Sequence, residues 1–352
     1  MASDPPRKTP LPDSIRDVEH LEELLSEPSP GVIETVRKID GDFIVLGVGG
    51  KMGPTLARML RRAIDAAGIQ RRVVGVSRFT AGELPDQLRG HGIEPLACDL
   101  LDPPSLSKLP DVRNVVYMAG MKFGTTGQHA RTWAMNAYLP GMVAQKFRHS
   151  RIVAFSTGNV YPMVPVYAGG CAEDHDPFPN GEYGMSALGR ERIFEHFSRS
   201  LQIPMAIIRL NYAVEMRYGV LVDMAERIRR GEPIDVSMGN LNAIWQADAN
   251  AMSIRAFEDV ATPPLVLNLT GPETLSVRGL SVEFGRLMNK PPTFVGSETG
   301  VAFLNNAGRC FGLYGYPSVA PGQVVRWTAD WVSRGGQSHG KPTHFEVRDG
   351  KY

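Results

Sequence analysis

The sequence contains only three cysteines, and their spacing suggests no shared site. Cys98, Cys171 and Cys310 form no C-x-x-C pair. This argues against a disulfide framework and against a zinc site, and it indicates a reducing compartment. The eight histidines are also scattered without metal-ligand spacing, so no bound metal is expected.

Long apolar runs and an excess of one charge are also missing. No stretch approaches the roughly 20 apolar residues of a membrane span, and the polar N-terminus lacks the apolar core of a signal peptide. Lys and Arg number 38 against 37 Asp and Glu, without a basic run interleaved with aromatics, which disfavours a nucleic acid as partner. We therefore expect a cytoplasmic protein that acts on a small molecule.

What the sequence does contain, from residue 41 onward, is an alternation of short apolar runs with helical patterns. Such alternation is typical of βαβ units. It predicts an α/β fold, a Rossmann-type doubly wound parallel sheet with a smaller C-terminal substrate-binding lobe. The apolar runs expected to form strands lie near residues 42–48, 71–78, 114–120, 151–157 and 205–211.

Composition divides the chain into four segments. Residues 1–40 are expected to form an N-terminal extension with one short helix, which should end at the Pro-Gly pair of EPSPG. Residues 41–211 should form the dinucleotide-binding domain, with the loop 162–182 near the substrate. Residues 212–334 should mainly form the substrate-binding lobe, with segments returning to the core, and residues 335–352 should form a polar tail.

A glycine-rich turn, VLGVGGKMG, follows the first expected strand and opens a helix. The spacing G-x-G-x-x-G fails because Met52 occupies its last position, whereas Gly47, Gly50 and Gly53 satisfy G-x-x-G-x-x-G. Glycines at these places permit a tight turn, let the backbone approach a pyrophosphate and let the helix pack on the strand. The helix N-terminus offers N–H groups and a positive dipole end to phosphates. The turn, including Lys51, should therefore hold a dinucleotide.

This spacing resembles that of the extended short-chain dehydrogenase/reductase family, which includes nucleotide-sugar epimerases and dehydratases. Further similar motifs, among them VVGVSR, ACDLLD and VYMAGMKFG, follow in chain order over most of residues 41–275. The resemblance implies a homodimer formed through helices that flank the sheet. It also implies cofactor contacts from Ser77, Arg78, Asp99, Leu100, Ala119 and Gly120.

The end of the second strand bears on the choice of cofactor. Ser77 stands where family members that prefer NAD carry an acid for the ribose hydroxyls, and Arg78 follows it. Because a guanidinium pairs well with a ribose phosphate, this pattern favours NADP over NAD.

The stretch RIVAFSTGNVYP resembles the end of the family's fourth strand. The match puts Thr157 where the family keeps its catalytic Ser or Thr, with Ser156 beside it. A hydroxyl there can hydrogen-bond the substrate oxygen whose carbon gains or loses hydride. Gly158 and Asn159 then follow where sugar 4,6-dehydratases carry acids, and Asn cannot shuttle a proton, so that type of dehydratase is disfavoured.

Tyr183, in EYGMSALGRE, lies at the spacing the family gives its catalytic tyrosine, which moves the proton of the reacting hydroxyl and lies beside the cofactor. A phenol with a pKa near ~10 is a weak base at neutral pH and needs a nearby positive charge. The family supplies it with a lysine four residues on, where this chain has Ala187.

Three interpretations of this alanine stay open. Another cation replaces the lysine, with Arg190 on the same helical face and Lys122 after the third strand as candidates. Alternatively, the chemistry needs less base strength, or catalysis is lost and the protein only binds the dinucleotide.

The leading hypothesis is an NAD(P)-dependent epimerase or oxidoreductase that acts on a hydroxyl or keto group of a sugar, sugar derivative or nucleotide sugar. The resemblance alone implies the nucleotide sugar. The alternatives are a non-catalytic dinucleotide-binding regulator and a reductase of a non-sugar carbonyl.

Overall fold

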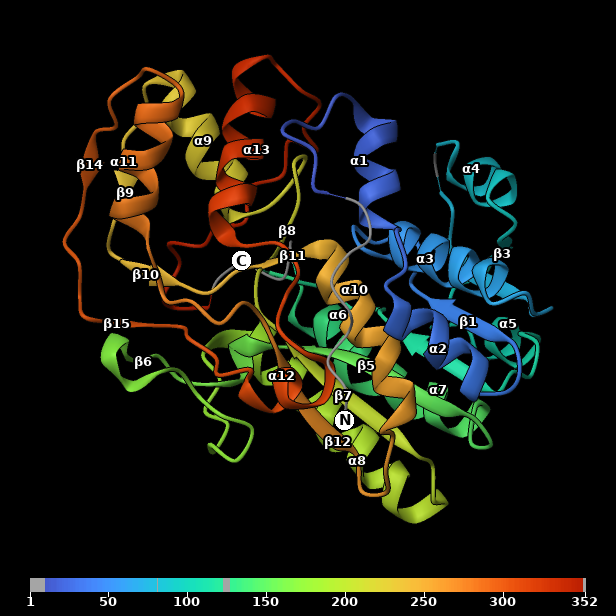
Figure 1. The fold of residues 1–352 in the computed structure, drawn as a ribbon. Helices are drawn as coiled ribbons and strands as arrows, with labels where there is room; N and C mark the ends of the chain where they lie inside the picture. The colour runs from blue at the N-terminus through green and yellow to red at the C-terminus, as the bar shows by residue number, and fades with distance from the viewer. Residues whose placement is uncertain (1–9, 81, 123–126, 351–352) are drawn as a thin grey trace.

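A seven-stranded parallel sheet forms the centre of the computed structural model, which describes residues 10–80, 82–122 and 127–350 (Figure 1). The strand order is β12-β7-β5-β4-β1-β2-β3, and every neighbouring pair is parallel. The order reverses between β1 and β4, where ligands bind in doubly wound sheets. The predicted sheet is confirmed. Its strands are β1 (Phe43–Leu46), β2 (Val73–Ser77), β3 (Glu94–Ala97), β4 (Asn114–Tyr117), β5 (Arg151–Thr157), β7 (Met205–Leu210) and β12 (Leu265–Leu269).

Alternate residues of each strand enter two separate hydrophobic cores, because successive side chains of a strand point to opposite faces. Phe43 and Val45 pack on one face, and Ile44 and Leu46 on the other. The first face is covered by α2, α3 and α10, which contact one another, and the second by α5, α7 and α8. The helices of this part are α1 (Val18–Leu25), α2 (Pro30–Lys38), α3 (Gly53–Ala66), α4 (Leu84–Gly90), α5 (Pro103–Ser107), α6 (His129–Trp133), α7 (Leu139–Lys146), α8 (Gly181–Leu201) and α10 (Gln246–Arg255).

The N-terminal extension differs from the prediction of one short helix, because it forms two. Pro30 does not end a helix but begins α2, where its missing N–H costs no hydrogen bond. Ser29 caps this helix by accepting a hydrogen bond from the Val32 amide at 3.3 Å. The side chains of Val32 and Val36 are buried in the core, so the extension covers the sheet.

The remaining elements form a lobe beside the sheet, in which α9, α11 and α13 pack together (Figure 1). No helix in the described ranges is long and apolar enough to cross a membrane. The C-terminal segment 335–350 has neither helix nor strand, yet Phe345 within it is buried. The elements still to be given are α9 (Val220–Arg230), α11 (Val277–Leu287), α12 (Gly308–Tyr314), α13 (Pro321–Ser333), β6 (Val164–Pro165), β8 (Ala213–Val214), β9 (Ile234–Asp235), β10 (Asn240–Leu241), β11 (Ile244–Trp245), β13 (Leu275–Ser276), β14 (Phe294–Val295) and β15 (Val301–Ala302).

Candidate active site

A cavity of about 290 Å³ lies at the carboxyl ends of β1, β4, β5 and β7. Ligands of doubly wound sheets bind in such a crevice, beside the point where the strand order reverses. Residues that are far apart in the sequence meet there. Eleven residues that the sequence predicts for the site line this cavity, namely Gly47, Gly50, Lys51, Met52, Gly53, Gly120, Lys122, Ser156, Thr157, Tyr183 and Arg190.

The glycine turn has the geometry that a pyrophosphate requires. Gly47 has a φ of +92°, which favours glycine, and a Cβ there would lie 2.8 Å from the Ala119 amide nitrogen. A Cβ on Gly53 would overlap the carbonyl of Val48, so only glycine lets α3 approach the strand this closely. No side chain caps the N-terminus of α3, which begins at the cavity wall. Its first N–H groups are thus suited to bind phosphate oxygens.

Tyr183 and Thr157 meet in the cavity from different elements. Thr157 ends β5, and its hydroxyl donates to Asn159 Oδ1 at 3.1 Å. Tyr183 lies in the first turn of α8, where burial raises the pKa of its phenol. A hydrogen bond with Thr157 and the charge of Arg190 act in the opposite direction on that pKa. The pair can therefore share the oxygen of one reacting group.

Arg190 is a buried cation that is held in place beside the tyrosine. Its guanidinium donates to the Phe155 carbonyl and to Asn136 Oδ1, each at 2.8 Å. Asn136 lies in a π-helical turn, Ala134–Tyr138, a geometry that is frequent at functional sites. A side chain on Gly120 would overlap the guanidinium, so this glycine leaves the space that Arg190 occupies.

Two lysines also reach the cavity. The Lys122 ammonium lies 5.7 Å from the centre of the Tyr183 ring, and burial lowers its pKa to about 8. Lys51 lies over the Tyr218 ring, 2.8 Å from its centre. Burial, together with the charges of Lys122 and Lys341, lowers the Lys51 pKa to about 7.

Ser156 lines the cavity, but its hydroxyl is already bonded elsewhere. It donates to Glu191 Oε1 at 2.5 Å, and Glu191 in turn forms a buried ion pair with Arg209 at 2.8 Å. Ala187 does not line the cavity. It is fully buried in a third hydrophobic cluster, together with Val160 and Met238 among others.

The remaining residues predicted to bind the cofactor lie outside the cavity lining. Ser77 ends β2 and its hydroxyl packs against Gly49, while Arg78 is exposed. Asp99 Oδ1 accepts a hydrogen bond from the Leu101 amide at 3.0 Å. Leu100 and Ala119 are buried in the second core.

Some residues of the cavity lining were not predicted, and the sequence carries little signal for them. Tyr218 and Gln246 belong to the segment assigned to the lobe, and Gln246 donates to Thr55 Oγ1 at 3.1 Å. Thr343 belongs to the expected tail, and its amide donates to Asp223 Oδ2 at 2.7 Å. No repeat or motif marks a tail residue as one that folds back onto the sheet.

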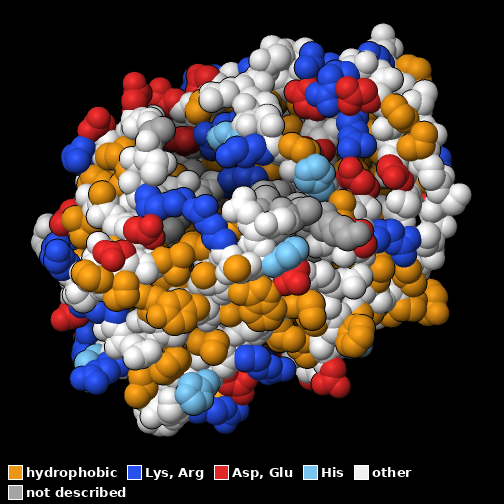
Figure 2. Space-filling model, turned by 180° about the vertical axis from the view of Figure 1, so that it is seen from behind, with side chains coloured by type: hydrophobic (Ala, Val, Ile, Leu, Met, Phe, Trp, Pro, Cys, Tyr) orange, Lys and Arg blue, Asp and Glu red, His pale blue; other side chains and the backbone are white. Residues whose placement is uncertain are grey.

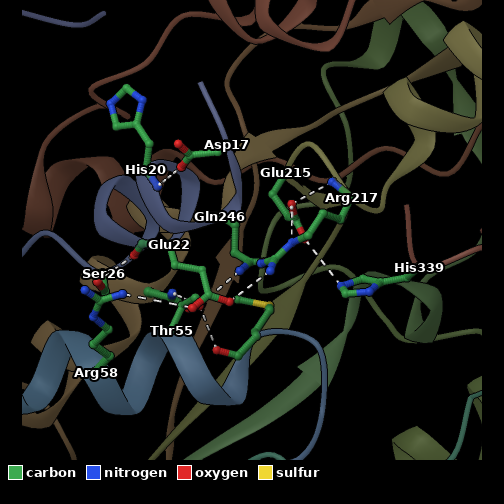
Figure 3. A network of polar contacts seen from close by, with 12 residues as sticks. Asp17, His20, Glu22, Ser26, Thr55, Arg58, Glu215, Arg217, Gln246 and His339 are labelled. Atoms are coloured by element: carbon green, nitrogen blue, oxygen red, sulfur yellow. Dashed lines mark hydrogen bonds and ion pairs between the residues drawn. The ribbon is translucent and has the colours of Figure 1, made fainter. Parts of the chain in front are cut away.

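A partly buried polar network joins segments from both ends of the chain beside this cavity (Figure 3). Arg217 pairs with Glu215 at 3.1 Å and with Glu22 of α1 at 2.9 Å. His339 Nε2 lies 3.7 Å from Glu215, whose carboxyl pKa is raised by burial. Glu215 and Arg217 therefore bind each other within this network.

Comparison with known proteins identifies similar sequences and folds. The sequence profile described as the NAD dependent epimerase/dehydratase family matches residues 43–246. A UDP-glucuronic acid 4-epimerase from Bacillus cereus, solved with UDP-glucuronic acid and NAD, is 18% identical, with a TM-score of 0.68 over 83% of this chain and 99% of its own. A UDP-glucose 4-epimerase from Thermotoga maritima, solved with UDP-glucose, is 17% identical, with a TM-score of 0.66 over the same shares. These likenesses show the fold. No curated protein sequence matches the chain significantly.

Proposed function

Because the chain belongs to the NAD dependent epimerase/dehydratase family, we propose that it is an NAD(P)-dependent epimerase or oxidoreductase acting on a sugar hydroxyl or keto group. The observation that carries this proposal is that the glycine turn, Thr157 and Tyr183 line one cavity. The similar structures hold UDP sugars. Among sugars and sugar derivatives, this supports a nucleotide sugar as the substrate.

Each residue of the cavity has a separate role in the proposed reaction. A nicotinamide dinucleotide held at the glycine turn by Gly47, Gly50 and Gly53 would supply the hydride acceptor or donor. Tyr183 takes the proton of the reacting hydroxyl, and Thr157 holds the same oxygen by a hydrogen bond. Arg190 replaces the family's lysine as the fixed positive charge, because its charge opposes the rise that burial causes in the Tyr183 pKa. Lys122 adds a second charge that titrates near pH 8.

We also propose that the cofactor is NADP or NAD, with NADP preferred. The Bacillus cereus structure holds NAD, which supports a nicotinamide dinucleotide in general. The finer choice rests on β2, which ends in Ser77 rather than in a carboxylate and is followed by the exposed Arg78. A guanidinium suits a ribose 2′-phosphate. The ratio of the Michaelis constants for NADP⁺ and NAD⁺ tests this choice.

The test of the reaction follows nicotinamide absorbance over sugars, sugar acids and nucleotide sugars with each cofactor. Epimerisation, which returns the hydride, is followed by NMR of the product isomer. Tyr183→Phe should lower turnover by about 10²- to 10⁴-fold, the usual contribution of general acid–base catalysis. The matched control Tyr316→Phe, on a tyrosine that is 73% exposed outside the cavity, should leave turnover unchanged.

Two results would count against the proposal. Full turnover in Tyr183→Phe would remove the acid–base role. Tight dinucleotide binding without turnover on any substrate would favour the non-catalytic regulator instead.

We further propose a cytoplasmic homodimer. The three cysteines are free and buried, which suits a reducing compartment. Trp133, Tyr138 and Met185 are exposed apolar residues on the helices beside the sheet and suit a contact between subunits. Light scattering of the purified protein measures the oligomeric state.

A further inference from the structure

A second cavity, of about 430 Å³, lies on the outer side of the glycine turn. Its walls come from α1, α3, α4 and the C-terminal residues 337–341, and it shares Gly50 and Lys51 with the first cavity. Figure 2 shows one face of the molecule, on which Lys, Arg and His side chains gather around a hollow.

The lining of this second cavity is strongly cationic. Lys51, Arg58, Arg217 and Lys341 line it, and Glu22 is the single carboxylate among its lining residues. Glu22 already forms an ion pair with Arg217 at 2.9 Å and lies 4.0 Å from Arg58. Arg217 is also paired with Glu215 at 3.1 Å, and the Lys51 pKa is lowered to about 7, so the positive charge left for a ligand comes mainly from Arg58 and Lys341. This remaining charge favours an anionic ligand.

Two histidines in the wall respond to this charge. Burial and the charge of Arg58 lower the pKa of His91. Burial and the charges of Arg217, Lys51 and Lys341 lower the pKa of His339. Both side chains are therefore neutral donors near neutral pH, and a bound anion would raise their pKa values again.

The C-terminal segment is anchored on both sides of Lys341. On one side the His339 amide donates to the Arg217 carbonyl at 2.9 Å. On the other side the Thr343 amide donates to Asp223 Oδ2 at 2.7 Å. These anchors hold the intervening lysine at the cavity wall, so the segment forms part of the cavity.

The second cavity begins where a dinucleotide would place its adenosine ribose. Gly49 and Leu84 line it, and Gly49 packs against Ser77 at the end of β2. In doubly wound folds this strand end contacts the ribose, and the N-terminus of the first helix contacts the pyrophosphate. A phosphate carried by a nucleotide in the first cavity is thus within reach of the second.

We propose that the second cavity binds a phosphate group of a nucleotide and that Lys341 of the C-terminal segment completes the site. The inference rests on the proposed dinucleotide function. The phosphate is either the 2′-phosphate of the dinucleotide or the diphosphate of a nucleotide substrate.

The experiment compares the full-length protein with Lys341→Ala by calorimetry. The probes are NADP⁺, NAD⁺, 2′,5′-ADP, 5′-AMP and UDP. Lys108→Ala, which removes an exposed lysine outside both cavities, is the matched control. Loss of a charge-assisted hydrogen bond should weaken binding by about 10-fold.

The pattern of weakening identifies the phosphate. If NADP⁺ and 2′,5′-ADP bind about 10-fold more weakly to Lys341→Ala, while NAD⁺ and 5′-AMP are unchanged, the cavity takes the 2′-phosphate. If only UDP is weakened, the cavity takes the diphosphate of the substrate. Arg58→Gln should weaken the same ligand in either case.

Two failures are distinguishable. If the wild type binds dinucleotide and neither substitution changes any affinity, the phosphate site is refuted while the proposed function stands. If the wild type binds none of the probes, both proposals are refuted.

Discussion

Replacing Ala187 with lysine would restore the family's residue, yet the structure indicates that it would damage the protein rather than improve it. Ala187 has no exposed surface and packs with Val160, Met238 and Leu304 in the third hydrophobic cluster. A lysine there must enter packed apolar side chains instead of the cavity.

The cost has two parts. Forcing extra atoms into a packed core costs about 1–3 kcal/mol. Burial also lowers the pKa of a lysine, and each unit of that shift costs about 1.4 kcal/mol at a pH where the unfolded chain keeps the proton. For Ala187→Lys we expect the free energy of unfolding to fall by about 2–5 kcal/mol at pH 7.

The sign of the pH dependence separates the two parts. A lysine whose pKa is depressed in the folded state destabilises it below the unfolded pKa of ~10.4, and the penalty shrinks as the pH rises toward that value. The difference in unfolding free energy between Ala187→Lys and the wild type should therefore narrow between about pH 7 and about pH 10. Ala187→Met adds volume without charge, so its difference in unfolding free energy from the wild type should not change with pH.

The assay is urea unfolding of both variants and of Ser200→Lys, which places a lysine at an exposed position of the same helix outside the proposed subunit contact and should change stability by less than about 0.5 kcal/mol. Unchanged stability together with a gain in turnover for Ala187→Lys would refute the reasoning. It would mean that position 187 faces the cavity.

Three further predictions concern residues in or near the cavity. Thr157→Val should lower turnover by about 10²-fold. Ser156→Ala should mainly lower the free energy of unfolding, because the Ser156 hydroxyl is bound to a buried carboxylate. Turnover and urea unfolding of both variants check this prediction. In the wild type, the Lys122 ammonium should raise kcat/KM below about pH 8, and this effect should be lost above that pH. Lys122→Met should therefore remove the corresponding fall from the pH profile of kcat/KM. Tyr161→Phe removes buried hydrogen bonds to Arg209 and Asn268, so urea unfolding should show a loss of about 1–3 kcal/mol, with turnover retained because Tyr161 does not line the cavity.

The parts predicted well from the sequence are those that depend on local patterns. The strand around residues 43–46 is a continuous apolar run, and the glycine turn after it has a spacing that only close backbone approach explains. Both signals lie within a few neighbouring residues. The sheet and the glycine turn could therefore be located without a structure.

The parts that were missed depend on long-range packing. From the local sequence alone, the Pro-Gly pair at residues 30–31 can either end one helix or begin the next. The burial of Val32 in the core favours the second arrangement. Thr343 reaches the cavity only because its backbone bonds to Asp223, about 120 residues earlier. Nothing in the local sequence of a polar, glycine-rich tail records such a partner.

The missing lysine and the buried arginine are best understood as one rearrangement. Position 190 lies seven residues after Tyr183, two helical turns away and on nearly the same face of α8. To reach the cavity from there, the guanidinium needs the space left by Gly120 and the acceptor that Asn136 presents from its π-helical turn. Ala187 is then free to pack in the hydrophobic cluster. A reversal at position 187 alone cannot restore the family arrangement, because Arg190 and its partners already occupy the surroundings of the phenol.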